Sequence, residues 1–176
     1  SYMTLLTSNI LQLEEIRALL GKVPEGIYSM KRDVLSGASI GQHVRHLLEF
    51  YVTLEQGLKA NVVCYDARAR DLRIETDLSY SIQVVDKAIV FMSSSFFDKN
   101  AFKRNITLRA SYGVDVSVDI DIDTTVEREL AYCMDHAIHH LAIIKISLIE
   151  SGVDLKMEAD LGVASSTLRY REICAQ

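Results

Sequence analysis

Five histidines form two groups in this sequence, and together they could bind a metal ion. His136, His139 and His140 lie in the stretch DHAIHHLAIIKI, and His43 and His46 lie in GQHVRHLLEF. Neutral imidazoles are common ligands of zinc and other transition metals. Residues four apart share one face of an α-helix, so His136 and His140 can converge on one ion. A third ligand must then come from the second group.

The helical pattern separates the three histidines of the first group. On an ideal helix the apolar stripe of this segment centres about 100° from His136, about 60° from His140 and about 160° from His139. We therefore expect His136 and His140 to border the core, and His139 to be exposed or to contact a partner subunit. The stretch lacks the glutamate of the HExxH pattern, which excludes a zinc protease of that class.

Long stretches with apolar residues at helical spacing can position these side chains. The expected helices run over Thr4–Lys22, Ser39–Lys59, Asp77–Ser93 and Thr125–Ser151. Ser39 is a typical N-cap, and Gly152 is a typical C-terminal stop. All five histidines lie on the second and fourth helices. Metal sites in helical bundles are built from inward side chains on facing helices.

The period changes to two between the third and fourth helices. Alternating apolar and polar residues over 106–122 predict a β-hairpin with Tyr112 and Gly113 at its turn. The sequence thus predicts an all-α fold: a four-helix bundle, one domain over residues 1–176, with a small β-hairpin inserted before the last long helix. The tail, residues 160–176, is expected to pack on the bundle as a short final segment.

Composition narrows the function classes. The formal net charge is −5, so the chain lacks the basic excess typical of nucleic-acid binding. Three widely spaced cysteines with no CxxC pair favour a reducing compartment, and the start of the sequence is unlike a signal peptide. No apolar run approaches the length of a membrane span. We expect a cytoplasmic protein with no nucleic-acid or membrane partner.

Three further features are candidates for a role near the histidines. Glu49 lies one helical turn after His46 and is a candidate to orient that ring or to act as a general base. Cys133 could be a fourth ligand, but a small buried core residue is the commoner role. Arg68 and Arg70 are expected to tie their loop to helix ends rather than to hold an anionic substrate.

The two histidine-bearing stretches, SIGQHVRHLLEF and DHAIHHLAIIKI, resemble those of the DinB/YfiT-like superfamily of metalloenzymes. The order of helix, histidine-bearing helix, helix and helix with a histidine pair also matches. The resemblance implies a four-helix bundle, often dimeric, that holds a divalent metal ion through His46, His136 and His140. Zinc or nickel is the expected ion.

The chain departs from some relatives at the second helix. They place that ligand about one turn later, where this chain has Phe50 and Tyr51, so His43 stays an alternative to His46. Apolar residues on a second face of the fourth helix, Tyr132 and Ile146 among them, favour a homodimer.

Three imidazoles leave an open position on zinc or nickel for a water or a substrate thiolate. The resemblance implies a metal-dependent enzyme, either a thiol-dependent transferase or a hydrolase, whose small-molecule partner includes a low-molecular-weight thiol. The alternative is a non-catalytic dimeric bundle, a binding or stress-related module whose metal site is structural or lost.

Overall fold

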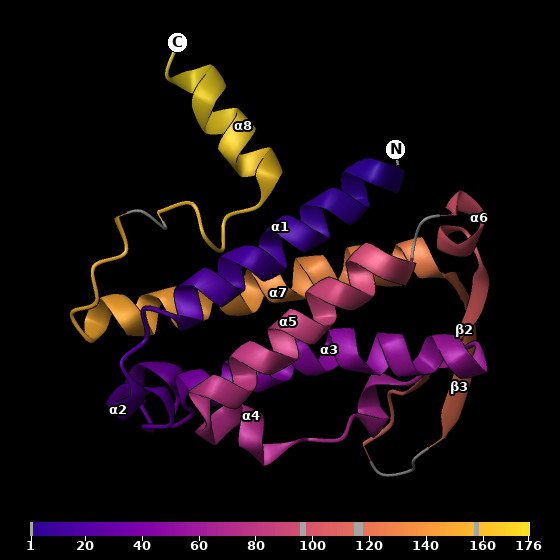
Figure 1. Ribbon diagram of the computed structural model, residues 1–176, viewed down its shortest axis with the longest axis horizontal. Coiled ribbons are helices and arrows are strands. Elements are labelled where there is room, and N and C mark those ends of the chain that lie inside the picture. Colours follow the sequence, from indigo (N-terminus) through magenta and orange to yellow (C-terminus); the bar gives the residue numbers. More distant parts are fainter. Residues whose placement is uncertain (1, 96–97, 115–117, 157–158) are drawn as a thin grey trace.

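Four long helices are the largest elements of the protein (Figure 1). The computed structural model describes residues 2–95, 98–114, 118–156 and 159–176. The long helices are α1 (Tyr2–Leu20), α3 (Ile40–Ala60), α5 (Leu78–Ser95) and α7 (Val126–Glu150). α1 packs against α5 and α7, and α3 packs against α7 and α5. Each predicted helix is present, with its ends within about two residues of the prediction.

Aliphatic side chains from all four long helices form the core between them. Residues such as Leu13, Leu47, Val85, Leu130 and Ile144 are almost fully buried. They recur at helical spacing along their helices, which explains why the apolar period predicted these elements well. None of the helices within the described ranges combines the length and apolar character needed to cross a membrane.

Shorter helices connect or extend the long ones. They are α2 (Glu25–Tyr28), α4 (Leu72–Thr76), α6 (Lys99–Phe102) and α8 (Ser165–Cys174), with 3-10 turns at Asp33–Leu35 and Tyr65–Ala67. The segment that contains the second 3-10 turn and α4 crosses beside α3, so loop residues 65–75 lie against the helix that carries His46.

The predicted stops and starts of two helices are confirmed. Ser39 forms a capping box: its hydroxyl accepts from the Gln42 N–H at 3.0 Å, and the Gln42 side chain accepts from the Ser39 N–H at 2.9 Å. After α7, the N–H of Gly152 donates to the carbonyl of Ile149, with the glycine at φ +82°.

A small three-stranded sheet lies at one end of the helices. β2 (Asn105–Ser111) pairs antiparallel with β3 (Asp119–Thr125), and the short β1 (Val62–Val63) pairs parallel with β2. The predicted hairpin is therefore present, but β1 was not predicted, because two residues carry no periodic signal.

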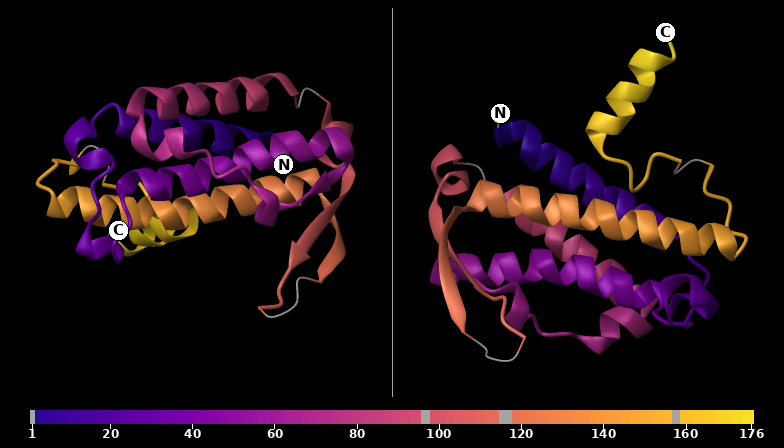
Figure 2. Two further views of the ribbon diagram at one scale, coloured as in Figure 1. Left: turned by 90° about the horizontal axis from the view of Figure 1, so that it is seen from below. Right: turned by 180° about the vertical axis from the view of Figure 1, so that it is seen from behind.

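Tyr112 and Gly113 lie in the connection between the two strands, but the second strand begins later than predicted. β2 ends at Ser111 and β3 begins at Asp119, so the connection is longer than a tight turn at Tyr112 and Gly113. Val114 is 99% exposed, so the alternating pattern at that point meets no core. Residues 115–117 lie outside the described residues. The hairpin projects beyond the helices (Figure 2).

The predicted packing of the tail is wrong for its helix. Leu161 is buried, and Lys145 of α7 donates to the carbonyls of Ala159 and Leu161. α8 then points away from α1 and α7 and buries none of its residues (Figures 1 and 2). Its larger apolar residues, such as Tyr170, gather on no single stripe wide enough to pack on the core.

Candidate metal centre

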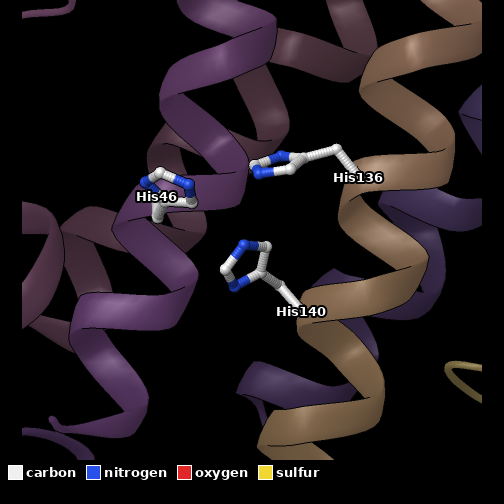
Figure 3. Close-up of side chains that lie close together, drawn as sticks. All are labelled: His46, His136 and His140. Atoms are coloured by element: carbon white, nitrogen blue, oxygen red, sulfur yellow. The ribbon is translucent and has the colours of Figure 1, made fainter. Parts of the chain in front are cut away.

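Three imidazoles point toward one another between α3 and α7 (Figure 3). His46 comes from α3, and His136 and His140 come from α7. Their ring centroids lie 4.6 to 4.8 Å apart, and one nitrogen from each ring lies within 4.8 Å of the others. The structure thus brings together the three residues that the sequence analysis and the family resemblance had selected.

Helix periodicity explains why these side chains meet. His136 and His140 are four residues apart on α7 and flank the fully buried Ala137, so both rings lie at the edge of the core. They are half-buried, and so is His46. His139 is exposed, as the helical wheel predicted, and its ring centroid lies 5.6 Å from that of His140.

His43 lies behind the cluster and contacts one of its members. Its Nδ1 is 2.9 Å from Nδ1 of His140, so one of these two nitrogens donates a hydrogen bond to the other. The other nitrogen of His140, Nε2, faces the rings of His46 and His136 (Figure 3). This arrangement favours His46 as the third ring of the cluster and gives His43 the part of orienting His140.

Burial keeps the clustered imidazoles neutral. It lowers the pKa of His46 to about 4, with a further contribution from the positive charge of Arg68. It also lowers the pKa of His136 to about 4 and that of His140 to about 3, and the neighbouring imidazoles add to both shifts. All three rings are unprotonated near neutral pH, which is the form that binds a metal ion.

The cluster suits a divalent ion after a small adjustment. Two nitrogens bound to one tetrahedral zinc are about 3.4 Å apart, since each Zn–N bond is about 2.1 Å. The nitrogens here lie within 4.8 Å of one another, so they would approach one another by up to about 1.4 Å. Nδ1 of His136 is buried without a hydrogen-bond partner in the part of the chain described, which leaves unused bonding capacity in the cluster.

Aromatic rings cover one side of the cluster. The ring of Phe50 stacks on His136, with centroids 3.8 Å apart, and also on Tyr65, at 4.7 Å. Tyr132 lies 5.9 Å from His136. Tyr51, which follows Phe50 on α3, donates its hydroxyl to Asn9 of α1 at 2.8 Å. Its phenol oxygen is therefore engaged on the α1 side.

Glu49 faces the loop instead of the histidines. It is buried, accepts a hydrogen bond from the N–H of Asp71 at 2.9 Å, and lies 3.4 Å from Arg45 and 4.0 Å from Arg68. The expected role as a hydrogen-bond partner of His46 is wrong. The ion pairs draw the carboxylate toward loop 65–75, which crosses beside α3, a contact that the sequence of α3 alone does not reveal.

Arg68 holds its loop, as expected, and it also lies close to the histidine cluster. It donates to the carbonyl of Tyr65 at 3.2 Å, as expected of a residue that holds its loop. Its guanidinium also lies 5.9 Å from the centre of the Phe50 ring, and its charge acts on the pKa values of His46 and His136. Arg70, by contrast, is exposed and donates to the carbonyl of Asp66 at 3.5 Å.

A buried carboxylate, Glu129, lies one layer further from the cluster. It accepts hydrogen bonds from the hydroxyls of Tyr65 and Thr124, both at 2.8 Å. Glu129 lies seven residues before His136, which places both on the same side of α7. This spacing is the feature of the sequence that could have identified Glu129 as a neighbour of the site. Cys133 is fully buried, as expected of a core residue, and burial raises the pKa of its thiol to about 12.

Comparison with known proteins adds one partial likeness. No family model matches the chain, and no solved structure matches it. A protein of the fungus Rhizopus delemar named FK506-binding protein 5 is 31% identical over 109 residues. The shared stretch covers 62% of this chain but only 27% of that protein's length, so its name assigns no activity to this chain.

Proposed function

We propose that this protein is a metal-dependent enzyme of the DinB/YfiT-like type, with His46, His136 and His140 as the ligands of a zinc or nickel ion. The observation that carries the proposal is the convergence of three neutral imidazoles from two facing helices. Three ring nitrogens on one ion leave a coordination position open, which is typical of catalytic sites.

The side chains around the cluster have separate parts in this proposal. His43 holds His140 through its Nδ1, so Nε2 of His140 is directed to the ion. Phe50 covers one face of His136 and limits the access of water from that side. A zinc or nickel ion bound here would acidify a bound water or hold a substrate thiol as its thiolate.

Thiol-dependent transfer is the reaction class that we favour over hydrolysis. Among the residues described, the carboxylates form no hydrogen bond with the three imidazoles, and Glu49 is engaged by arginines. Hydrolysis commonly uses a carboxylate near the metal as a general base. A low-molecular-weight thiol brings its own nucleophile, so a transferase has less need of such a base.

The same lack of a nearby base supports a second candidate function. This is a non-catalytic dimeric module, for binding or stress response, in which the ion is structural. In both candidates we propose that α1, α3, α5 and α7 form the four-helix bundle of the superfamily, that the protein is a cytoplasmic homodimer, and that exposed apolar residues of α7 such as Ile146 contribute to the interface.

Metal analysis of protein purified without a histidine tag tests the metal site. After reconstitution with zinc or nickel and removal of excess metal, we expect about one ion per chain. The variants H46A, H136A and H140A should each lose it. H139A is the matched control, because His139 lies next to His140 on the same helix but is exposed and is not one of the three converging imidazoles. Wild-type protein without bound metal, or equal loss in H139A, would refute the proposal.

Spectroscopy of the cobalt-substituted protein separates the two candidate functions. An open position accessible to a thiol gives a thiolate-to-cobalt charge-transfer band when a small thiol is added. A structural site with four filled positions gives no such band. Light scattering of the same samples tests the homodimer.

A further inference from the structure

A pocket of about 430 Å³ lies between the aromatic side of the metal centre and the projecting hairpin. This volume is within the range of small-molecule binding sites, about 300–1,000 Å³. The pocket is lined from three directions: by α3 and α7, by the loop after β1, and by β2 and β3.

Three aromatic rings form the wall nearest to the histidines. Phe50, Tyr65 and Tyr132 line the pocket, and their ring centroids lie 4.7 to 5.9 Å from one another. Phe50 and Tyr132 also contact His136. One layer of aromatic rings therefore separates the pocket from the imidazole cluster.

Aliphatic residues of the hairpin line the other side. Leu108 and Ile122 are directly paired across β2 and β3, so their side chains share one face of the hairpin, and both line the pocket. Ile122 is 38% exposed although it faces a hollow lined by aromatic rings. An apolar side chain in this position gains burial when a ligand fills the pocket.

Two acidic groups at the pocket already have partners. Glu129 accepts from Tyr65 and Thr124, and Asp66 accepts from the N–H of Ser111 at 3.0 Å. The other charged residues of the lining are Arg68, Arg109, Asp123 and Arg128. The facing rings and aliphatic side chains form the apolar recognition surface of the pocket. Flat rings opposed to aliphatic side chains favour a flat apolar ligand through stacking and burial.

We propose that this pocket binds a flat aromatic group of a small organic molecule. The inference deepens the proposed function and rests on it in one respect: in a metal-dependent transferase, the pocket would hold the aromatic part of the acceptor substrate beside the metal centre. The pocket itself can be tested with no metal present.

The probe is N-phenyl-1-naphthylamine, a neutral aromatic dye whose fluorescence rises in apolar surroundings. The protein contains no tryptophan, so the dye signal is free of indole emission. We expect saturable binding at one site per chain. I122D should weaken it at least tenfold, because a carboxylate would face the ring of the dye. Y132S, at a partly exposed position, provides a second variant with an expected weakening of severalfold.

I120D is the matched control. Ile120 lies on the same strand and the same face, is similarly exposed at 44%, and is not part of the pocket lining. Its dye affinity should stay within twofold of wild type. Equal weakening in I120D and I122D, or an absence of saturable binding, would overturn the proposal. A fall in molecular mass in both variants would show instead that a second copy of the chain covers this face.

Measuring both metal content and dye binding tests the proposed metal site and the proposed pocket separately. H136A should bind the dye with at most a severalfold change while losing the ion, and I122D should keep the ion while losing the dye. Wild-type protein that binds dye but never metal would refute the proposed function and leave the pocket standing. Wild-type protein that binds metal but no dye would refute the pocket alone.

Discussion

Replacing His43 by phenylalanine should weaken metal binding without changing its stoichiometry. The Nδ1 of His43 lies 2.9 Å from Nδ1 of His140 and can accept its proton. That hydrogen bond fixes the tautomer of His140 and directs Nε2 toward the other two rings. Phenylalanine keeps the ring shape and removes the acceptor, so His140 would be free to change tautomer and to rotate.

The size of the effect follows from the single bond that is lost. A hydrogen bond between neutral partners contributes about 0.5–1.5 kcal/mol. Loss of a group that orients a metal ligand typically lowers metal affinity about 10- to 100-fold, which corresponds to about 1.4–2.7 kcal/mol. We expect H43F to lower the metal affinity about 10- to 100-fold. H43N should recover part of the loss, because the asparagine oxygen lies close to the position of Nδ1.

Competition with a chromogenic zinc chelator measures both affinity and stoichiometry. H43F should still bind about one zinc per chain, whereas H46A should bind none. H139F is the control for adding an aromatic ring beside the cluster, and it should match wild type. Unchanged affinity in H43F would refute the orienting role. If H43F binds no zinc and H46A still binds about one zinc per chain, then His43, not His46, is the ligand.

Other expected outcomes concern the fold around the site. Because burial lowers the pKa of the clustered imidazoles from 6.5 to about 3–4, the unfolded chain takes up protons first as the pH falls. The melting temperature of metal-free protein should therefore drop from pH 6.5 to about 4, and more steeply than in a variant with both α7 ligands changed to glutamine; equal slopes would contradict this. Y65F removes a donor to the buried Glu129 and should lower the free energy of unfolding by about 1–3 kcal/mol in urea titrations. S39A removes the capping box of α3 and should cost about 1 kcal/mol by the same measurement, with no effect on metal content. G41A would place a methyl group 2.1 Å from the carbonyl oxygen of Glu75, so a loss of about 1–3 kcal/mol is expected, and an unchanged denaturation midpoint would show that α4 moves freely.

Local signals made the helices and the histidine cluster predictable. Apolar residues at a spacing of three to four identify the long helices, and Ser39 marks the start of α3 through a bond to a residue three positions away. The spacing of four between His136 and His140 puts both rings on one face of α7. The partnership of these two with His46 came from the family resemblance, because helical spacing alone left His43 open.

Long-range contacts made the rest unpredictable. Glu49 turns toward Arg68 and Asp71 because a loop about twenty residues later crosses beside α3. Nothing in the helical period of α3 carries that information. At Val114 the local pattern predicted a strand that the structure does not have. Val114 is exposed, and an alternating pattern forms a strand only where a core or a partner strand lies beside it.

The small sheet has a mechanical consequence for the distance between α3 and α7. β1 follows α3 after one residue, and β3 runs directly into α7, so β2 joins the ends of the two helices that carry the imidazoles. A slip of one residue along these strands would slide one helix past the other by about 3.3 Å. That is more than twice the adjustment of up to about 1.4 Å that the ring nitrogens need. The strand register thus sets the spacing of the metal ligands, and substitutions that shift the register, unlike changes of a single exposed side chain, should alter metal affinity without touching a ligand.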